Sequence, residues 1–217
     1  MATIGVSKPY YAKYSAVNGA VSYSGGGVMG KMTEVEVSIE TSEDNNLYAD
    51  NTVAETDQSF SNGSLTLSTD DLSQEVTKDL LGVVAQALDE IEGVSDTEVT
   101  ELIFDDRQVT PYLGVGFIIK KRRNHADRWR AIVLTKVMFS VPSDSATTQG
   151  ESIEWQVPEL TGTIMRDDGE THMWKREATF TTEAQAEAYI KHRLSIGAEA
   201  AAAMFSRAGL NIGGEEV

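Results

Sequence analysis

Hydrophobic and polar positions alternate strictly in two stretches of the first third of the chain. Residues 34–40 put two valines and an isoleucine on one face and acids on the other, namely Glu34, Glu36 and Glu40. Residues 63–68 repeat this alternation with two leucines. A period of two residues is typical of a strand with one buried face. We therefore expect two half-buried strands, the first with a carboxylate-rich outer face.

The hydrophobic period changes to about 3.6 residues over residues 71–91. Asp71 is followed three residues later by Gln74, as in a capping box, and Gly82 interrupts the pattern near its middle. We predict one helix over residues 71–91, with a weak point at Gly82. A second helix is predicted over residues 182–194, which begins with a capping pattern and carries its acids early and its bases late.

Strand patterns return after the first helix in six stretches, which are residues 99–104, 112–121, 128–140, 152–157, 160–165 and 173–180. The Asp-Gly pair at 168–169 predicts a hairpin between the last two. The order of elements predicts a mainly β fold with flanking helices (α+β), built as an antiparallel β-sandwich or barrel. One helix would be inserted after the second strand and one would lie near the C-terminus. We expect one domain over residues 1–197 and an Ala- and Gly-rich arm over residues 198–217.

The length and composition allow one domain with a proper core, since the chain has 217 residues and 41% of them are hydrophobic. No stretch approaches the roughly 20 apolar residues of a membrane span, so we expect no membrane segment. The start of the chain has no apolar block of signal-peptide length, and the absence of cysteine excludes disulfide and thiolate chemistry. We expect the chain to fold in a cytoplasm.

The formal net charge of −16 is distributed unevenly. The segment 120–130 holds six of the 18 Lys and Arg residues and one acid, so it carries +5 and the remaining chain carries −21. Three interpretations stay open: a solvated hairpin tip, nucleic-acid binding with an aromatic side chain for stacking, or contact with an acidic face of an identical subunit. The candidate contact residues are Lys120, Lys121, Arg122, Arg123, Arg128, Trp129 and Arg130.

Motifs for catalysis are incomplete. The stretch GGGVMGKM at 25–32 resembles a phosphate-binding loop, but Met32 stands where a magnesium-binding Ser or Thr belongs, and a strand pattern follows instead of a helix. We interpret it as a flexible glycine loop. The three histidines lack ligand spacing, and the acid pairs at 70–71, 105–106 and 167–168 fall at predicted turns. We predict no catalytic residue, no metal and no cofactor.

A long connection between residues 40 and 63 carries the sequence NNLYADN at 45–51. Such long loops are usually functional or mobile, and this one has a large apolar pair at its centre. We propose Leu47, Tyr48 and Asp50 as candidates for contact with another subunit. In the alternative, the loop folds back and tucks the apolar pair into its own core.

Five stretches in the same order resemble the major tail protein, or tail tube protein, of long-tailed phages of Gram-positive bacteria. The resemblance covers residues 34–194 and is carried by LYADN, SLTLSTDDLSQEVTKDLLG, TPYLGVGFIIKKRRN, RAIVLTKVMFSVPSDSATTQGESIEWQVPELTGTI and WKREATFTTEAQAEAYI. It implies a structural virion protein whose copies close into six-membered rings. The rings would stack into the tail tube through which DNA is ejected.

The resemblance also implies partners and a place of assembly. The partners would be the chain itself, tape-measure, tail terminator, baseplate and distal tail proteins, and DNA in transit without tight binding. Assembly would occur in the host cytoplasm and end in the virion tail. Because a lumen that passes DNA should repel phosphates, we expect it to be lined by Glu34, Glu36, Glu40 and Glu154. In the alternative these acids are solvent-facing positions of a free sandwich.

Two alternative functions remain. One is a tube subunit of a bacterial secretion or contractile-injection system, which would share the architecture. The other is a small hydrolase or nucleotide-binding domain, motivated by the glycine motif and the acid pairs.

Overall fold

One antiparallel sheet of eight strands forms most of this computed structural model, which describes residues 2–42, 45–49, 52–57, 59–87, 99–143, 148 and 156–197. The strand order is β2-β1-β9-β10-β11-β6-β3, and β12 pairs with β10. The strands are β1 (Ala2–Val17), β2 (Ala20–Val28), β3 (Met32–Thr41), β6 (Phe60–Thr69), β9 (Leu113–Arg123), β10 (Ala126–Phe139), β11 (Glu159–Met165) and β12 (Lys175–Phe180). The predicted mainly β, antiparallel fold with flanking helices is confirmed.

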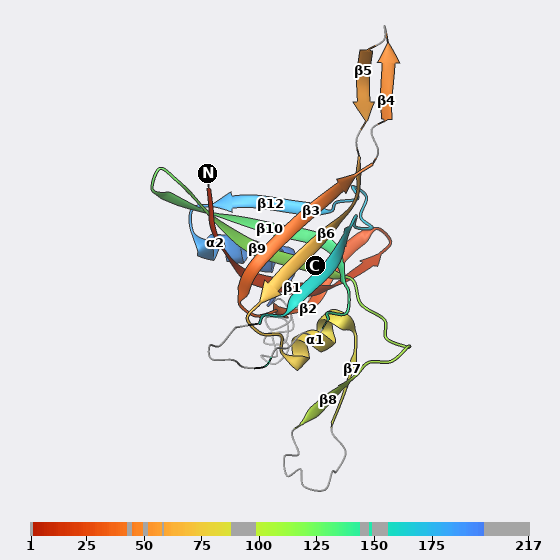
Figure 1. The fold of residues 1–217 in the computed structure, drawn as a ribbon, viewed down its shortest axis with the longest axis vertical. Helices are drawn as coiled ribbons and strands as arrows, with labels where there is room; N and C mark the ends of the chain where they lie inside the picture. The colour runs from red at the N-terminus through yellow and green to blue at the C-terminus, as the bar shows by residue number, and fades with distance from the viewer. Residues whose placement is uncertain are drawn as a thin grey trace, which may run out of the picture.

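The sheet folds over so that β3, β6 and β11 cross in front of β1, β9 and β10 (Figure 1). The main core lies between these two layers, and its fully buried members include Leu65, Leu67, Phe117, Leu134 and Ile164. The two alternating segments are strands, as predicted. The leucines of β6 are fully buried, and the apolar side chains of β3 are half-buried against the same core.

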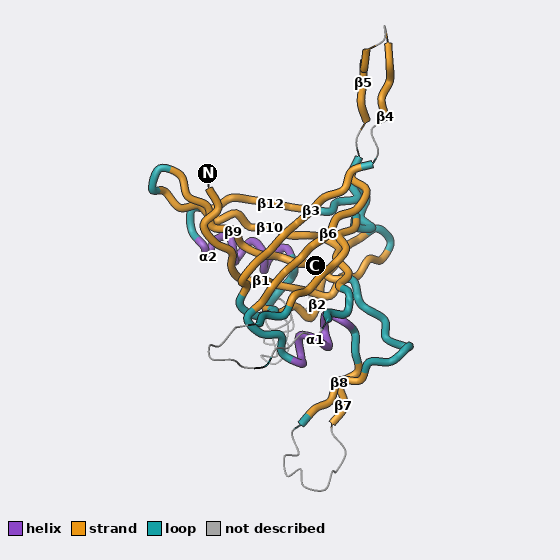
Figure 2. The backbone as a smooth tube through the Cα atoms, in the orientation of Figure 1, coloured by secondary structure: helices purple, strands orange, loops and turns teal. Residues whose placement is uncertain are grey.

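Helix α2 (Glu183–Arg193) covers the opposite face of β1, β9 and β10, as Figure 2 shows. The predicted helix over residues 182–194 is confirmed, and the side chain of Thr182 caps it by accepting a hydrogen bond from the backbone N–H of Gln185 at 3.3 Å. Ile190 packs so closely on β9 that a Cβ atom at Gly116 would lie 2.5 Å from its Cγ2 atom. With the core on one face and α2 on the other, residues 113–118 are buried without alternation.

Helix α1 (Gln74–Leu81) is much shorter than predicted, and it follows β6. Ser73, not Asp71, caps its start, since the Ser73 side chain accepts a hydrogen bond from the N–H of Val76 at 3.4 Å. Gly82 ends the helix in the left-handed conformation with φ 69°, where a Cβ atom would lie 2.2 Å from the carbonyl oxygen of Val109. The next residues form β7 (Val84–Ala87), which pairs with β8 (Thr100–Ile103).

The predicted hairpin around residues 168–169 is wrong. Strands β11 and β12 do not pair with each other but both run antiparallel to β10, one after the other along the same edge. β11 pairs with residues 136–139 and β12 with residues 129–134 of β10. The segment between them is therefore an excursion that leaves this edge and returns to it.

Two further differences concern the first 60 residues. The Tyr- and Gly-rich start forms the long hairpin β1–β2, with Asn18 and Gly19 both at positive φ in its two-residue turn. The predicted glycine loop is wrong over residues 25–28, which belong to β2. A Cβ atom at Gly26 would lie 2.6 Å from the side chain of Ile196 and 2.7 Å from the carbonyl oxygen of Tyr11, so this glycine permits close packing.

Candidate functional site

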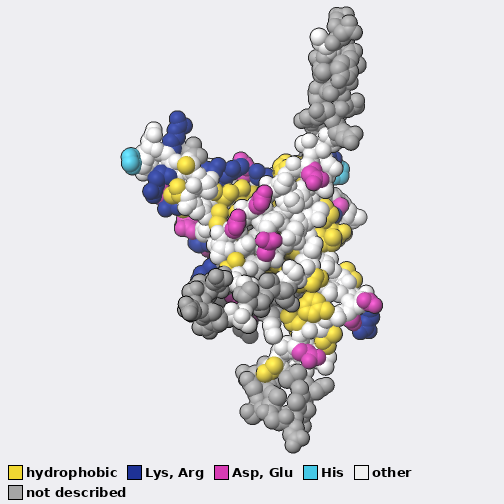
Figure 3. Space-filling model, viewed as in Figure 1, with side chains coloured by type: hydrophobic (Ala, Val, Ile, Leu, Met, Phe, Trp, Pro, Cys, Tyr) yellow, Lys and Arg dark blue, Asp and Glu magenta, His cyan; other side chains and the backbone are white. Residues whose placement is uncertain are grey.

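The outer face of β3, β6 and β11 is polar and acidic. β3 contributes Glu34, Glu36, Ser38 and Glu40, β6 contributes Asn62, Ser64 and Thr66, and β11 contributes Glu159, Thr161 and Thr163, whereas Ser68 at the end of the β6 row is buried. The four glutamates are exposed, and this set, which we call the acidic face, contains no Lys or Arg. Figure 3 shows acidic side chains over this part of the body. The strand register thus gathers carboxylates and hydroxyls on one uncovered surface.

Sequence reasoning found part of this face. Glu34, Glu36 and Glu40 lie on the exposed face of β3, as the alternation predicted, because strand alternation is a local property. Glu154 lies outside the described residues, as does most of the predicted strand over residues 152–157, of which Gln156 and Val157 have no regular structure. Glu159 was missed, although the alternation of Glu159, Thr161 and Thr163 with buried positions was a visible signal.

The segment 120–130 forms the tip of the β9–β10 hairpin, which we call the basic hairpin (Figures 1 and 3). A two-residue turn closes it, with Asn124 at φ 51° and His125 at φ 61°, and both values lie in the left-handed region. Such a turn matches the twist of the strands and fixes their register. Cross-strand neighbours are Arg123 with Ala126, Arg122 with Asp127, Lys121 with Arg128, and Lys120 with Trp129.

Asp127 pairs with both cations on one face of the basic hairpin and offsets one of their two charges. Its carboxylate lies 2.9 Å from the ammonium of Lys120 and accepts a hydrogen bond from Nη2 of Arg122 at 2.9 Å. These contacts, led by that from Arg122, hold the pKa of Asp127 well below its usual range. The ammonium of Lys120 also lies 5.5 Å from the centre of the Trp129 ring.

Arg130 has an acidic partner on the neighbouring strand. Its guanidinium forms an ion pair with Glu177 of β12, which also pairs with Lys175 at 2.7 Å. Hydrogen bonds from Lys175 and then Arg130 lower the pKa of Glu177 to about 2. Trp129 packs against the hydrophobic cluster beneath α2. Four of the seven candidate contact residues in this segment therefore have partners within the subunit, namely Lys120, Arg122, Trp129 and Arg130.

The apolar pair proposed for contact lies on a hairpin and not in a loop. β4 (Asn45–Ala49) pairs with β5 (Thr52–Asp57), and Leu47 lies opposite Glu55 and Tyr48 opposite Val53. The backbone of this hairpin projects away from the sheet beyond the ends of β3 and β6 (Figure 1). The backbone of this segment therefore does not fold back onto the core, which was the alternative prediction. Asp50 lies outside the described residues.

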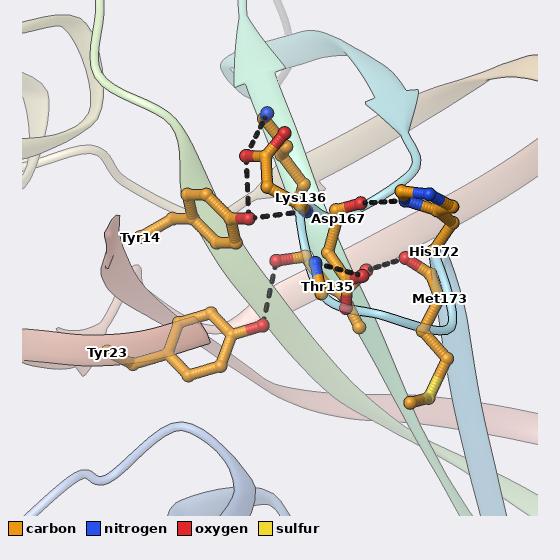
Figure 4. A network of polar contacts seen from close by, with 9 residues as sticks. Tyr14, Tyr23, Thr135, Lys136, Asp167, His172 and Met173 are labelled. Carbon is orange, nitrogen blue, oxygen red and sulfur yellow. Dashed lines mark hydrogen bonds and ion pairs between the residues drawn. The ribbon is translucent and has the colours of Figure 1, made fainter. Parts of the chain in front are cut away.

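A polar network holds the excursion between β11 and β12 against β10 (Figure 4). The hydroxyl of Tyr14 donates to the carboxylate of Asp168 at 2.8 Å, and the ammonium of Lys136 lies 2.7 Å from the same carboxylate. The hydroxyl of Tyr23 donates to the carbonyl oxygen of Thr135 at 2.8 Å. Burial raises the pKa of Tyr14 to about 12, whereas Lys136 and then Tyr14 lower the pKa of Asp168. The network joins the hairpin β1–β2 to the point where β10 changes partner.

An open cavity of about 950 Å³ lies beside α1. Its lining residues are Asp71, Leu72, Thr77, Leu81, Phe104, Val141, Pro142, Ser143, Gln156, Val157, Pro158 and Glu159. The lining offers two carboxylates and two hydroxyls but no Lys, Arg or His to serve as their catalytic partner. Its chemistry is that of a mixed apolar and acidic surface.

The sequence motifs considered for catalysis occupy structural positions. The glycine motif runs from β2 through a turn into β3. Asp70 accepts a hydrogen bond from the N–H of Lys31 at 2.7 Å, Asp105 from that of Arg107 at 2.9 Å, and Asp167 from that of Gly169 at 3.2 Å. These acids therefore hold turns and chain reversals. Within the described ranges, no group of three or more His, Asp or Glu side chains is placed to hold a metal ion.

Comparison with known proteins gives no matching family model and no significantly similar curated sequence. No helix in the described part of the chain is long and apolar enough to cross a lipid bilayer.

Proposed function

We propose that this chain is a structural subunit of a phage tail tube, which assembles with copies of itself into stacked rings around a channel for DNA. The acidic face carries this proposal. It belongs to a layer whose other side is the main core, and neither helix covers it. Among the described residues, its glutamates have no Lys or Arg partner. A wall with these properties stays hydrated and repels phosphates, which carry the same sign of charge. Repulsion suits a channel for DNA, because each phosphate neutralised by the wall would add affinity and therefore slow the passage of DNA.

The strand edges and the projecting hairpins support self-assembly. Among the described strands, β2 and β3 end the sheet and β12 pairs with β10 alone, so each has an edge that can pair with another chain. The β4–β5 hairpin and the basic hairpin extend from the body in different directions (Figure 1). Contacts made by different surfaces of the same chain are heterologous and build rings or filaments.

The proposal includes the partners and location that such a tube needs. Tape-measure protein and then DNA would occupy the channel, while terminator, baseplate and distal tail proteins would bind its ends. The subunit would act in the virion without catalysis or a cofactor. The alternative is the tube of a bacterial secretion or contractile-injection system. An acidic lining would suit that tube only if its cargo were also negatively charged.

Electron microscopy of the purified chain tests the proposal. Concentrated protein should form hollow tubes or six-fold rings in negative stain. A monodisperse monomer that persists under all salt and pH conditions would refute it. Nucleotide turnover by the same preparation would instead favour the hydrolase alternative.

A further inference from the structure

The two faces of the basic hairpin differ in how their charges are satisfied. Residues alternate between the faces of a strand, so Lys120, Arg122 and Asp127 lie on one face and Lys121, Arg123 and Arg128 on the other. The first face contains its own acid. The second face holds Arg130, which pairs with Glu177 of β12, and three further cations, Lys121, Arg123 and Arg128, which we call the cationic face.

None of these three cations has a carboxylate partner among the residues that the structure describes. Lys121 lies between Thr3 of β1 and Arg128 of β10, so its neighbour on one side is polar and on the other is another cation. Arg123 lies opposite Ala126. The guanidinium of Arg128 donates to the backbone carbonyl oxygen of Asp127 at 3.0 Å, which leaves its charge uncompensated.

Like charges placed directly opposite each other destabilise an antiparallel pair of strands. Lys121 and Arg128 are such a pair, held together by a register that the tight turn and the long strands β9 and β10 determine. An anion placed over this face would remove the repulsion and gain attraction from three cations at once. The arrangement is therefore suited to a partner that brings carboxylates or phosphates to one side of the hairpin.

We propose that the cationic face binds a carboxylate-rich surface of a second copy of this chain; the inference rests on the proposed self-assembly. The remainder of each copy carries −21, so a second copy has an excess of carboxylates from which such a surface can be formed. The same excess of acids opposes nucleic acid as the occupant, because it repels a strand of phosphates from the body behind the hairpin. Charge complementarity of this kind sets register and speeds association.

Neutralising the two faces separately tests this inference. The variant Lys121→Gln/Arg123→Gln changes the cationic face, and the matched control Lys120→Gln/Arg122→Gln makes the same change of net charge on the adjacent residues of the same strand. Circular dichroism would establish that both are folded. Sedimentation and negative-stain microscopy would then give the lowest protein concentration at which each forms rings or tubes.

We expect the cationic-face variant to raise this concentration on the order of tenfold, because two exposed charge pairs per contact are lost, and the control to stay within about twofold of wild type. Equal shifts in the two variants, or no shift in either, would overturn the inference while leaving tube formation intact. Failure of the wild-type chain to assemble would overturn both the inference and the proposed function. A 30-base-pair DNA duplex that binds wild type but not the cationic-face variant, with assembly unchanged, would assign the face to nucleic acid and overturn the inference.

Discussion

Replacing Gly116 with alanine should loosen α2 from the sheet. A Cβ atom there would lie 2.5 Å from Cγ2 of Ile190, whereas ordinary contacts begin at 3.4 Å. Either the strand or the helix must therefore move by roughly 1 Å, and overpacking of this kind costs about 1–3 kcal/mol. For a protein of this size, each kcal/mol lowers the melting temperature by about 2–4 °C.

Gly5→Ala is the matched control, because Gly5 also lies in a strand and a Cβ atom there would meet nothing within 4 Å. This control should be neutral or stabilise the fold by up to about 1 kcal/mol, since alanine is less flexible in the unfolded chain. Urea unfolding followed by circular dichroism measures both changes in the free energy of unfolding.

A double-mutant cycle with Ile190→Ala separates this contact from a general effect of the substitution. Ile190 is fully buried, so its truncation alone should cost about 2–5 kcal/mol. The added methyl group at position 116 would occupy part of the vacated space, and the double variant should be more stable than the sum predicts by about 0.5–3 kcal/mol. Strict additivity, or a Gly116→Ala effect as mild as that of Gly5→Ala, would refute the reasoning.

Three further predictions concern the channel, the hairpin and acid stability. Glu34→Lys/Glu36→Lys should leave tubes intact but slow or block genome passage, whereas the Gln pair should be milder; unchanged infectivity with the Lys pair would contradict the channel assignment. Leu47→Ser/Tyr48→Ser should give folded monomers that no longer polymerise by sedimentation; normal tubes would contradict the contact role. Hydrogen bonds from Lys191 and then Lys8 lower the pKa of Glu187 from 4.5 to about 2, so the unfolded chain binds more protons than the folded one between these pH values. Stability should therefore fall as the pH drops from about 4.5 to 2. Glu187→Gln should make the urea midpoint less dependent on pH in this range, and an unchanged dependence would contradict the prediction.

The parts of the fold that sequence reasoning predicted are those determined by local patterns. Alternation identified β3 and β6, and the capping pattern at Thr182 identified α2 within one residue at each end. The turn of the β1–β2 hairpin was missed although Asn18-Gly19 is a strong hairpin signal. Strand β1 was not predicted because Tyr10, Tyr11 and Ala12 are all buried, so it lacks the alternation that is typical of a strand with one solvent-exposed face.

The errors come from pairing between distant segments. The helical period continues past Gly82, but residues 84–87 pair with residues 100–103, and no pattern within residues 71–91 encodes that partner. Likewise, an Asp-Gly pair favours a hairpin, yet β12 gains a longer partner by returning to β10. For the candidate site, the run of cations was visible in the sequence. Their division into a face that contains its own acid and a cationic face required the register that the turn at Asn124 and His125 determines.

The basic hairpin continues the two strands at the centre of the sheet, and this continuity bears on how it would bind. β9 and β10 are buried on both faces below the tip, between the main core and α2, so the direction of the hairpin is determined by folding of the subunit. A contact surface that is ordered before association loses less conformational entropy when it binds. Its charges then act at a defined position and not as a flexible tail, which is the condition for a repeated contact to give the same angle between every pair of subunits.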